Sequence, residues 1–385
     1  MAPVFFYGTL RHPALLNVVL GHKAAVTGAM LAGYALLCVR GKTYPMIVPR
    51  AGAGVAGLVL EQPTGCDLAR LAFYEAGYHL AADPVTVTLG HGSAARQVLA
   101  QVFLPDAGSA EPAGPWHLAD WQAARGEMAV LAAREYMAAF GTATAGQMAG
   151  RYPMMLVRAA SHIRSRSDPA PTELRHAQGP GDVEVLALSQ PYAHFFAVEE
   201  YDLRHRRFDG AMSGRLNRAT FVSGDAAVVL PYDPLLDRVM IVEQFRPGPY
   251  ARGDRQPWQL EPIAGRIDPG ESPEQAARRE AREEAGIELG ALLPVGNFYP
   301  SPGAKTEYLY SFVGIADLSD DRPRLAGLAA EGEDIRAHVL PFDRLMALVH
   351  SGEVATAPLL MTAYWLEHRR AALRADAGIR PQPPP

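Results

Sequence analysis

The chain has 385 residues, of which 49% are hydrophobic and 20% are charged, and its formal net charge is −5. This length exceeds what one hydrophobic core usually organises, so we expect two domains. No apolar run approaches the ~20 residues that a membrane-spanning helix needs, and the acidic balance offers nucleic acid no basic surface. The composition therefore predicts a globular protein that binds neither a membrane nor nucleic acid.

The start of the chain and its cysteines point to a reducing compartment. The first residues, MAPVFFYGTL, lead directly into a strand-like run without the basic and apolar regions of a secretory signal. Cys38 and Cys66 belong to no CxxC or Cys/His zinc spacing, so both are expected to be reduced core residues. We therefore expect a cytoplasmic protein.

The first part of the chain is predicted to be mostly β. Strand-like runs separated by Gly and Pro turns extend from residue 3 to about residue 104, with one helical stretch near residues 67–76. This pattern places a small domain at residues 1–105. Residues 116–140 have helical apolar spacing, so residues 106–163 are expected to form a helical extension of that domain.

A polar segment that is rich in Pro and Gly, residues 164–183, has no hydrophobic periodicity and is predicted to be a linker. Strand-like runs resume after it, together with a helix at residues 273–285 and another near the C-terminus. A second domain is therefore expected at residues 184–375. The tail at residues 376–385 ends in RPQPPP and is expected to be disordered.

The most informative segment is GRIDPGESPEQAARREAREEAGI, residues 265–287. Ser272 is a good N-cap, and Gln275 completes a capping box with it. Pro273 suits the first helical position, and Gly286 suits a left-handed C-terminal position. These signals predict one helix over residues 273–285.

Three carboxylates of this helix, Glu280, Glu283 and Glu284, are predicted to project within one arc of its surface. Like charges at this spacing oppose each other, and acidic residues near a helix C-terminus oppose the macrodipole. A hard divalent cation explains the arrangement, since Mg²⁺ and Mn²⁺ prefer oxygen ligands. The alternative is a solvated face of glutamates and arginines, because arginines are interspersed among the acids.

The segment resembles the Nudix box, G-x5-E-x7-R-E-U-x-E-E-x-G-U, at every fixed position. Those positions are Gly265, Glu271, Arg279, Glu280, Ala281, Glu283, Glu284, Gly286 and Ile287. The resemblance implies an α/β/α sandwich, with Glu280 and Glu284 as principal metal ligands and Glu283 close by. It also implies that Arg279 pairs with Glu271 and braces the loop.

Further segments resemble the ADP-ribose pyrophosphatases, including those associated with tellurite resistance, over nearly all of residues 184–375. They are RHRRFDGAMSGRLNRATFVSGDAAVVLPYDP, VEQFRPGPY, LEPIAGRID, FYPSPG and AEGEDIRAHVLP. The resemblance implies hydrolysis of ADP-ribose to AMP and ribose 5-phosphate with Mg²⁺ or Mn²⁺, and a homodimer. A nucleoside triphosphate or a nucleotide sugar is the alternative substrate.

The same resemblance assigns roles to individual residues. The metals would be held by the backbone carbonyl of Ala264 and by Glu280, Glu283, Glu284 and Glu333. Arg218 and Arg246 would bind the diphosphate and ribose, because guanidinium forks suit phosphate oxygens. Glu261 would accept hydrogen bonds from the adenine or ribose, and Ser301 and Gly303 belong to the SPG signature.

Two of these roles have plainer alternatives. Phe195 or Phe196 is placed to stack on adenine, but either side chain is equally consistent with a core aromatic. Glu331 matches the family's general base and would act with Glu283 as a catalytic residue. A glutamate in a loop rich in Gly and Ala is otherwise simply solvated.

The N-terminal sequence VFFYGTLRHPALL resembles the γ-glutamylcyclotransferase-like (AIG2-like) fold, a small β-barrel-like domain with helices. The resemblance implies that Tyr7, Gly8, Thr9 and Leu10 bind the γ-glutamyl carboxylate. It also implies that Glu75 is the catalytic acid that moves a proton during cyclisation to 5-oxoproline. The alternatives are a strand and turn with a solvated glutamate, a retired site, or a pocket for an unrelated small amine.

Two overall interpretations follow for an α/β (α+β) protein of this kind. The first is a bifunctional enzyme, an ADP-ribose hydrolase joined to a γ-glutamyl cyclotransferase. The second is a Nudix hydrolase whose N-terminal domain binds only a small ligand or a protein.

Overall fold

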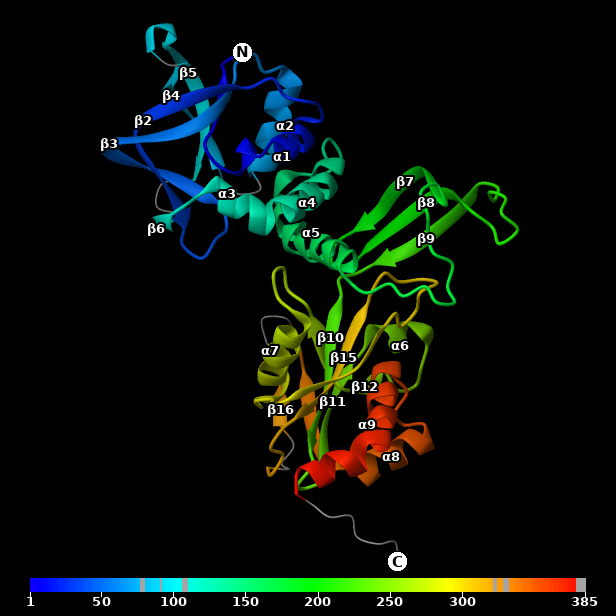
Figure 1. Ribbon diagram of the computed structural model, residues 1–385. Coiled ribbons are helices and arrows are strands. Elements are labelled where there is room, and N and C mark those ends of the chain that lie inside the picture. The colour runs from blue at the N-terminus through cyan, green and yellow to red at the C-terminus, as the bar shows by residue number, and fades with distance from the viewer. Residues whose placement is uncertain (77–79, 91, 106–109, 321–323, 328–331, 379–385) are drawn as a thin grey trace, which may run out of the picture. The chain divides into compact units, whose positions relative to one another are not determined.

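The computed structural model describes residues 1–76, 80–90, 92–105, 110–320, 324–327 and 332–378 (Figure 1). The chain divides into two compact units, Met1–Ser167 and Asp168–Pro385. None of the helices in the described ranges is long and apolar enough to cross a membrane. The tail residues 379–385, for which disorder is expected, lie outside the described residues.

Five strands of the first unit close into a barrel, because β2 pairs with both β3 and β4 in the order β2–β3–β1–β5–β4–β2. A short sixth strand pairs with β2. The strands are β1 (Val4–Phe6), β2 (Thr27–Val39), β3 (Pro45–Leu60), β4 (Leu80–Leu89), β5 (Arg96–Pro105) and β6 (Pro112–Pro115).

Successive side chains of β1 point to opposite faces, so this strand contributes to two hydrophobic cores. Phe5 packs inside the barrel, whereas Val4 and Phe6 pack against helices outside it. A Cβ at Gly57 of β3 would lie 2.2 Å from the Phe5 ring, so a glycine is required there. The barrel interior and the helical layer are therefore specified by the same short strand.

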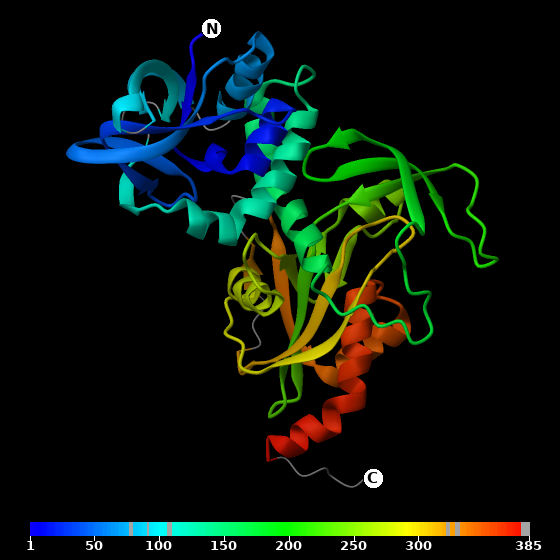
Figure 2. The ribbon, with the colours of Figure 1, turned by 45° about the horizontal axis from the view of Figure 1, so that its top comes forward.

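The four longest helices of this unit gather on one side of the barrel (Figure 2). The sequence does not predict α1, because its run PALLNVVL is as apolar as a buried strand. The helices are η1 (Thr9–Arg11), α1 (Pro13–Leu20), α2 (Gly65–Ala76), η2 (Gly92–Ala94), α3 (Leu118–Trp121), the π-helical η3 (Gln122–Gly126), α4 (Glu127–Ala138) and α5 (Ala145–Ser165).

The prediction that both cysteines lie in a core is wrong for Cys66, which is exposed, while Cys38 is partly buried. Cys66 stands in the first turn of α2, whose buried face is formed by Asp67, Leu71, Tyr74 and Glu75. Its position in the helical repeat therefore turns it toward solvent.

The second unit contains a mixed sheet in the order β14–β15–β10–β11–β17–β16, with β12 on β11 and β13 on β10. Its strands are β10 (Ala226–Asp233), β11 (Arg238–Phe245), β12 (Trp258–Glu261), β13 (Ile263–Arg266), β14 (Leu292–Phe298), β15 (Leu309–Ile315), β16 (Arg324–Ala326) and β17 (Ile335–Pro341).

This sheet is covered on both faces (Figures 1 and 2). On one face Ala227 and Val229 of β10 pack with α7 (Pro273–Ala285). On the other face Leu230 and Tyr232 pack with α8 (Phe342–Ser351) and α9 (Ala357–Asp376). The predicted α/β/α sandwich is confirmed, and the near-continuous apolar run of β10 results from burial on both faces.

A separate antiparallel sheet precedes the sandwich and consists of β7 (Val183–Ala193), β8 (Ala197–His205) and β9 (Leu216–Val222). The end of β9 joins the loop between β14 and β15, because the amide of Phe221 donates to the carbonyl of Ala304 at 2.7 Å. Phe221 also forms a parallel bridge with Lys305. The short α6 (Pro247–Arg252) follows β11.

Candidate functional site

Helix α7 begins and ends where the sequence predicts. The amide of Gln275 donates to the Ser272 hydroxyl at 3.2 Å, and the Gln275 side chain accepts from the Ser272 amide at 2.8 Å. Gly286 closes the helix in the left-handed conformation, with φ of 63°. The capping box and the C-terminal glycine are both confirmed.

Strand β13 brings its backbone directly against the acidic side of α7. The amide of Ala264 donates to Oε2 of Glu284 at 3.1 Å. A Cβ at Gly265 would lie only 1.7 Å from Oε1 of Glu280, so this close approach requires glycine. The loop and helix of the box therefore hold two carboxylates beside the backbone of Ala264.

The pKa values of these two carboxylates are raised above that of a solvated glutamate. Burial raises the pKa of Glu280 to about 7, with Arg279 opposing the rise. Burial also raises the pKa of Glu284 to about 8, although the Ala264 amide opposes it. Glu333 is close enough to raise both pKa values further. Buried acids that repel one another are the donor set that a divalent cation stabilises.

Arg279 is the positively charged side chain that binds the acidic residues of this segment. Its Nε and Nη2 each donate to a different oxygen of Glu271 at 3.0 Å, which confirms the predicted pair. Its Nη1 donates to Glu280 at 2.6 Å and to Glu283 at 2.9 Å. Burial lowers the pKa of Arg279, but these carboxylates raise it overall. One guanidinium therefore binds three glutamates of the box.

Within the described ranges, no three Asp, Glu, His or Cys side chains converge as a ready-made metal site. Arg279 binds an oxygen of Glu280 and an oxygen of Glu283 through its guanidinium. The donors nevertheless suit Mg²⁺ or Mn²⁺, since they are carboxylate and backbone oxygens around a buried, negatively charged position.

A second pair of predicted residues lies beside the acidic cluster. Nε of Arg246 donates to Oε2 of Glu261 at 2.7 Å. Burial raises the pKa of Glu261 and Arg246 opposes it, and Arg246 also opposes the rise at Glu284. The structure therefore brings Arg246, Glu261 and Glu284 into one electrostatic neighbourhood.

The remaining predicted substrate residues lie on the β7–β9 sheet and the adjoining loop. Arg218 is exposed on β9 and donates to the Asn217 carbonyl at 2.8 Å. Ser301 and Gly303 lie in the turn that is tied to β9, where the Ser301 carbonyl accepts from the amide of Ala304. The proposed base, Glu331, lies outside the described residues.

Phe195 stands at the turn between β7 and β8 and is 55% exposed, so it is not a core residue. The Arg266 guanidinium lies 3.7 Å from the centre of its ring. The Arg266 carbonyl accepts from Nη2 of Arg279 at 2.8 Å. Arg266 was not predicted from the sequence, and its position directly after Ala264 and Gly265 was the available signal.

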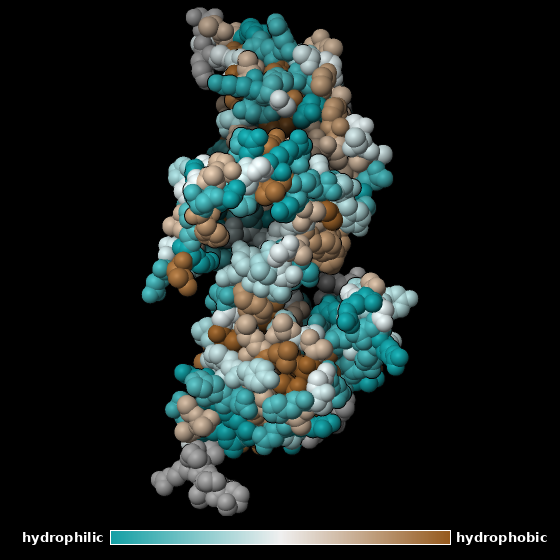
Figure 3. Space-filling model, turned by 90° about the vertical axis from the view of Figure 1, so that its right-hand side faces the viewer, coloured by the Kyte–Doolittle hydropathy of each residue, from teal (hydrophilic) through white to brown (hydrophobic). Residues whose placement is uncertain are grey.

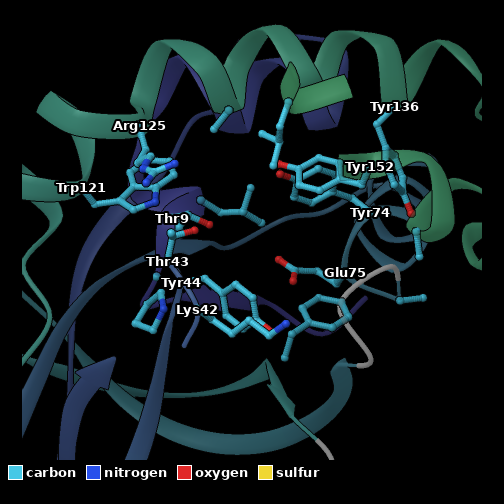
Figure 4. Close-up of a pocket in the computed structure, with 18 of the residues that line it drawn as sticks. Thr9, Lys42, Thr43, Tyr44, Tyr74, Glu75, Trp121, Arg125, Tyr136 and Tyr152 are labelled. Atoms are coloured by element: carbon cyan, nitrogen blue, oxygen red, sulfur yellow. The ribbon is translucent and has the colours of Figure 1, made fainter. Parts of the chain in front are cut away.

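The first unit contains a cavity of about 740 Å³. The YGTL loop lines it, as the resemblance implies, and Glu75 of α2 points into it (Figure 4). Burial raises the pKa of Glu75 to about 8. The Tyr7 hydroxyl donates to the Phe103 carbonyl at 3.0 Å, and both burial and Glu75 raise the pKa of Tyr7. Tyr7, Gly8, Thr9, Leu10 and Glu75 therefore share one cavity.

Much of the wall comes from residues that the sequence analysis did not single out. Lys42 and Tyr44 come from the segment between β2 and β3, and the helical part supplies further aromatic and cationic groups. The signal was the set of aromatic and basic residues within the amphipathic helices. The main helical contributors are Trp121, Arg125, Met128, Tyr136 and Tyr152.

Two protein families match the sequence of this chain, one in each unit. Residues 223–361 match the family described as NUDIX domain, and residues 4–123 match the family described as Gamma-glutamyl cyclotransferase, AIG2-like. The C-terminal unit is thus a Nudix domain and the N-terminal unit carries an AIG2-like domain, as the resemblances predicted.

Curated relatives align with the Nudix part. The ADP-ribose pyrophosphatase of Escherichia coli (strain K12) is 40% identical over 206 residues, which are 54% of this chain and 98% of that protein. The ADP-ribose pyrophosphatase of Haemophilus influenzae is 35% identical over 50% of this chain and 89% of that protein. The GDP-mannose pyrophosphatase of Escherichia coli (strain ATCC 8739) is 32% identical over 43% of this chain and 84% of that protein. The chain therefore belongs to the Nudix family.

The buried carboxyl of Glu75 makes the stability of the first unit depend on pH. Its pKa is about 8 in the folded protein against an ordinary value of 4.5, so between these values the folded state holds the extra proton. The free energy of unfolding should then fall as pH rises through this window. We expect Glu75→Gln to gain stability relative to wild type between about pH 5 and about pH 8.

Thermal denaturation at several pH values measures this gain. The matched control is Glu111→Gln, because Glu111 is exposed, and its pH profile should run parallel to wild type. A Glu75→Gln profile that is also parallel to wild type would show that Glu75 ionises in the folded protein as it does in water.

Proposed function

We propose that the C-terminal unit hydrolyses the diphosphate of ADP-ribose to AMP and ribose 5-phosphate, with Mg²⁺ or Mn²⁺ as the cofactor. The principal support is that 98% of an Escherichia coli ADP-ribose pyrophosphatase aligns with this chain at 40% identity. The likeness therefore extends well beyond the box. The buried Glu284 and the partly buried Glu280, beside the backbone of Ala264 and Gly265, support this proposal as candidate metal ligands.

The cation would be held by oxygens of the box and of the loop before β17. When bound, it neutralises the diphosphate and orients a water. Glu283 is only partly buried and would serve both as a ligand and as a group near the attacking water. The proposed ligands are the carbonyl of Ala264 and the carboxylates of Glu280, Glu283, Glu284 and Glu333.

The protein's own side chains would then bind and orient the substrate. Arg246, which pairs with Glu261 through Nε, would bind a phosphate oxygen. Arg218 would contribute a second guanidinium, and Phe195 an exposed ring for the adenine. Ser301 and Gly303 would shape the loop beside β9, and Glu331 would accept the proton of the attacking water.

A substrate panel tests this function. We expect kcat/KM for ADP-ribose to exceed that for GDP-mannose, UDP-glucose, NADH and ATP, with AMP and ribose 5-phosphate as products on chromatography. Chelator should abolish the reaction, and Glu284→Gln should lower kcat at least ~10²-fold, because it removes charge stabilisation in the transition state.

The matched control is Glu288→Gln, since Glu288 follows α7 but its side chain is 82% exposed. It should retain wild-type kcat. Full turnover in excess EDTA would refute the metal requirement. A nucleotide sugar that gave the highest kcat/KM would place the substrate closer to that of the GDP-mannose pyrophosphatases.

For the N-terminal unit we propose a γ-glutamyl cyclotransferase activity, which the buried Glu75 beside the YGTL loop favours. The α-amine of a γ-glutamyl compound attacks the γ-carbonyl, the ring C–N bond forms, and the original amide C–N bond breaks. The ionised fraction of the Glu75 carboxyl would accept the proton from the attacking neutral amine and return it to the leaving amine, and its raised pKa makes it a stronger base than a solvated carboxylate. The products are 5-oxoproline and the free amine.

Release of 5-oxoproline from γ-glutamyl amines measures this activity. Glu75→Gln should lower it at least ~10²-fold, the usual contribution of general acid–base catalysis. ADP-ribose hydrolysis by the same variant should be unchanged and serves as an internal control, because separate cores share little coupling energy. Failure of wild type to release 5-oxoproline would favour a binding role for this unit.

We also propose that the chain forms a homodimer through the β7–β9 sheet. A small sheet needs a covered hydrophobic face for stability, and β7 leaves Val185, Leu188 and Tyr192 each more than half exposed. Hydrophobic residues are visible at the molecular surface among hydrophilic ones (Figure 3). A second copy of this sheet would cover the exposed side chains of Val185, Leu188 and Tyr192.

Light scattering after gel filtration tests the dimer. Leu188→Asp should shift wild-type dimer toward monomer, because it places a charge in the contact. Leu174→Asp is the matched control, since Leu174 is 97% exposed and lies outside the sheet. A monomeric wild type, or a dimer that Leu188→Asp leaves intact, would contradict the proposal.

A further inference from the structure

The cavity of the first unit has an uneven charge. Lys42 and Arg125 are the cations among its described lining residues, and Glu75 is the acid. Because burial raises the pKa of Glu75 to about 8, its carboxyl is mostly neutral at pH 7. The other walls are largely aromatic or aliphatic. The cavity therefore favours a ligand that carries an anionic group.

Arg125 enters the cavity from an unusual piece of helix. It belongs to the π-helical turn Gln122–Gly126, which separates α3 from α4. A π-helical turn changes the direction of side chains relative to an α-helix and often marks a functional position. Arg125 lies beside Trp121, toward Thr9 and Thr43, whereas Glu75 lies toward Tyr74 and Tyr152 (Figure 4).

A side-chain hydrogen bond ties this turn to the YGTL segment. Nε2 of Gln122 lies 2.9 Å from Nδ1 of His12, and burial lowers the pKa of His12, so a neutral imidazole accepts this bond. The edge of the same ring contacts Trp121, with centroids 6.2 Å apart. His12 follows Thr9 by three residues, and Arg125 follows Gln122 by three. The bond therefore holds Arg125 near the loop.

We propose that Arg125 binds a carboxylate of the ligand at the Thr9 side of the cavity, while the reacting amine of the ligand faces Glu75. The ligand class is then an amino-acid derivative with both groups, and this choice rests on the proposed cyclotransferase function. The family match ends at residue 123, so it assigns no role to Arg125. A guanidinium suits this task because it offers a carboxylate two parallel donors.

The carboxylate could belong to the γ-glutamyl group or to the leaving amine, and three probes distinguish these sources. γ-Glutamyl-alanine has both carboxylates, γ-glutamyl-alaninamide lacks the one on the leaving amine, and 4-aminobutyryl-alanine lacks the α-carboxylate. Calorimetry measures their binding to full-length protein carrying Glu75→Gln, which blocks turnover. We expect one truncated probe to bind at least ~10-fold more weakly than γ-glutamyl-alanine, the scale of one charge-assisted hydrogen bond.

Adding Arg125→Met should weaken the binding of γ-glutamyl-alanine by the same factor. The affinities of γ-glutamyl-alanine and of that truncated probe should then be equal. Arg125→Lys should restore part of the difference, because it keeps the charge but loses the fork. Arg134→Met is the matched control, since Arg134 is exposed on α4 outside the cavity lining, and it should change nothing. Lys42→Met should leave the difference in place.

The proposal is overturned if Arg125→Met weakens all three probes equally or none of them, if Lys42→Met abolishes the difference, or if no probe binds. The cyclotransferase function is judged separately, by 5-oxoproline release from wild type. An Arg125-dependent difference without 5-oxoproline would sustain the carboxylate site and refute the activity. Release of 5-oxoproline by wild type, with probe binding that does not depend on Arg125, would sustain the activity and refute the carboxylate site.

Discussion

The hydrogen bonds of Arg279 with Glu271, Glu280 and Glu283 hold the Nudix box together. The same guanidinium binds the Arg266 carbonyl, so it connects the loop, the helix and the end of β13. Strand β13 in turn brings the Ala264 amide to Glu284 and Gly265 against Glu280, and a Cβ at Gly265 would collide with Glu280. The positions of Glu280 and Glu283 thus depend on one partly buried cation, and that of Glu284 on the Ala264 amide.

The two units bury acidic groups in different ways. In the Nudix unit, Arg279 limits the rise in the pKa of Glu280 that burial causes. The amide of Ala264 and Arg246 limit the corresponding rise at Glu284. In the AIG2-like unit, the cause of the raised pKa of Glu75 is burial, so its carboxyl keeps a proton at neutral pH. A cluster of carboxylates suits a divalent cation that neutralises a diphosphate, whereas a carboxyl with a pKa near neutrality suits proton transfer.

Hydrogen bonds between distant segments bring proposed substrate residues to positions that local sequence does not specify. The bridge between Phe221 and Lys305 ties the loop of Ser301 and Gly303 to β9, the strand of Arg218. In the first unit, the bond between Gln122 and His12 ties a π-helical turn to the YGTL segment across 110 residues of sequence. Both cases depend on a contact between segments that are far apart along the chain.

The sequence by itself determined the helix at residues 273–285, its capping box and its terminal glycine, because these depend on contacts within one or two turns. It also determined both family resemblances, and the Nudix resemblance implied the pair of Arg279 with Glu271. Tertiary structure alone decided that Cys66 is exposed, that Arg266 lies over Phe195, and that Trp121, Arg125 and Tyr136 line the cavity with Glu75. The physical reason is that burial and long-range packing depend on which surfaces meet, and the period of an amphipathic helix does not identify its partner.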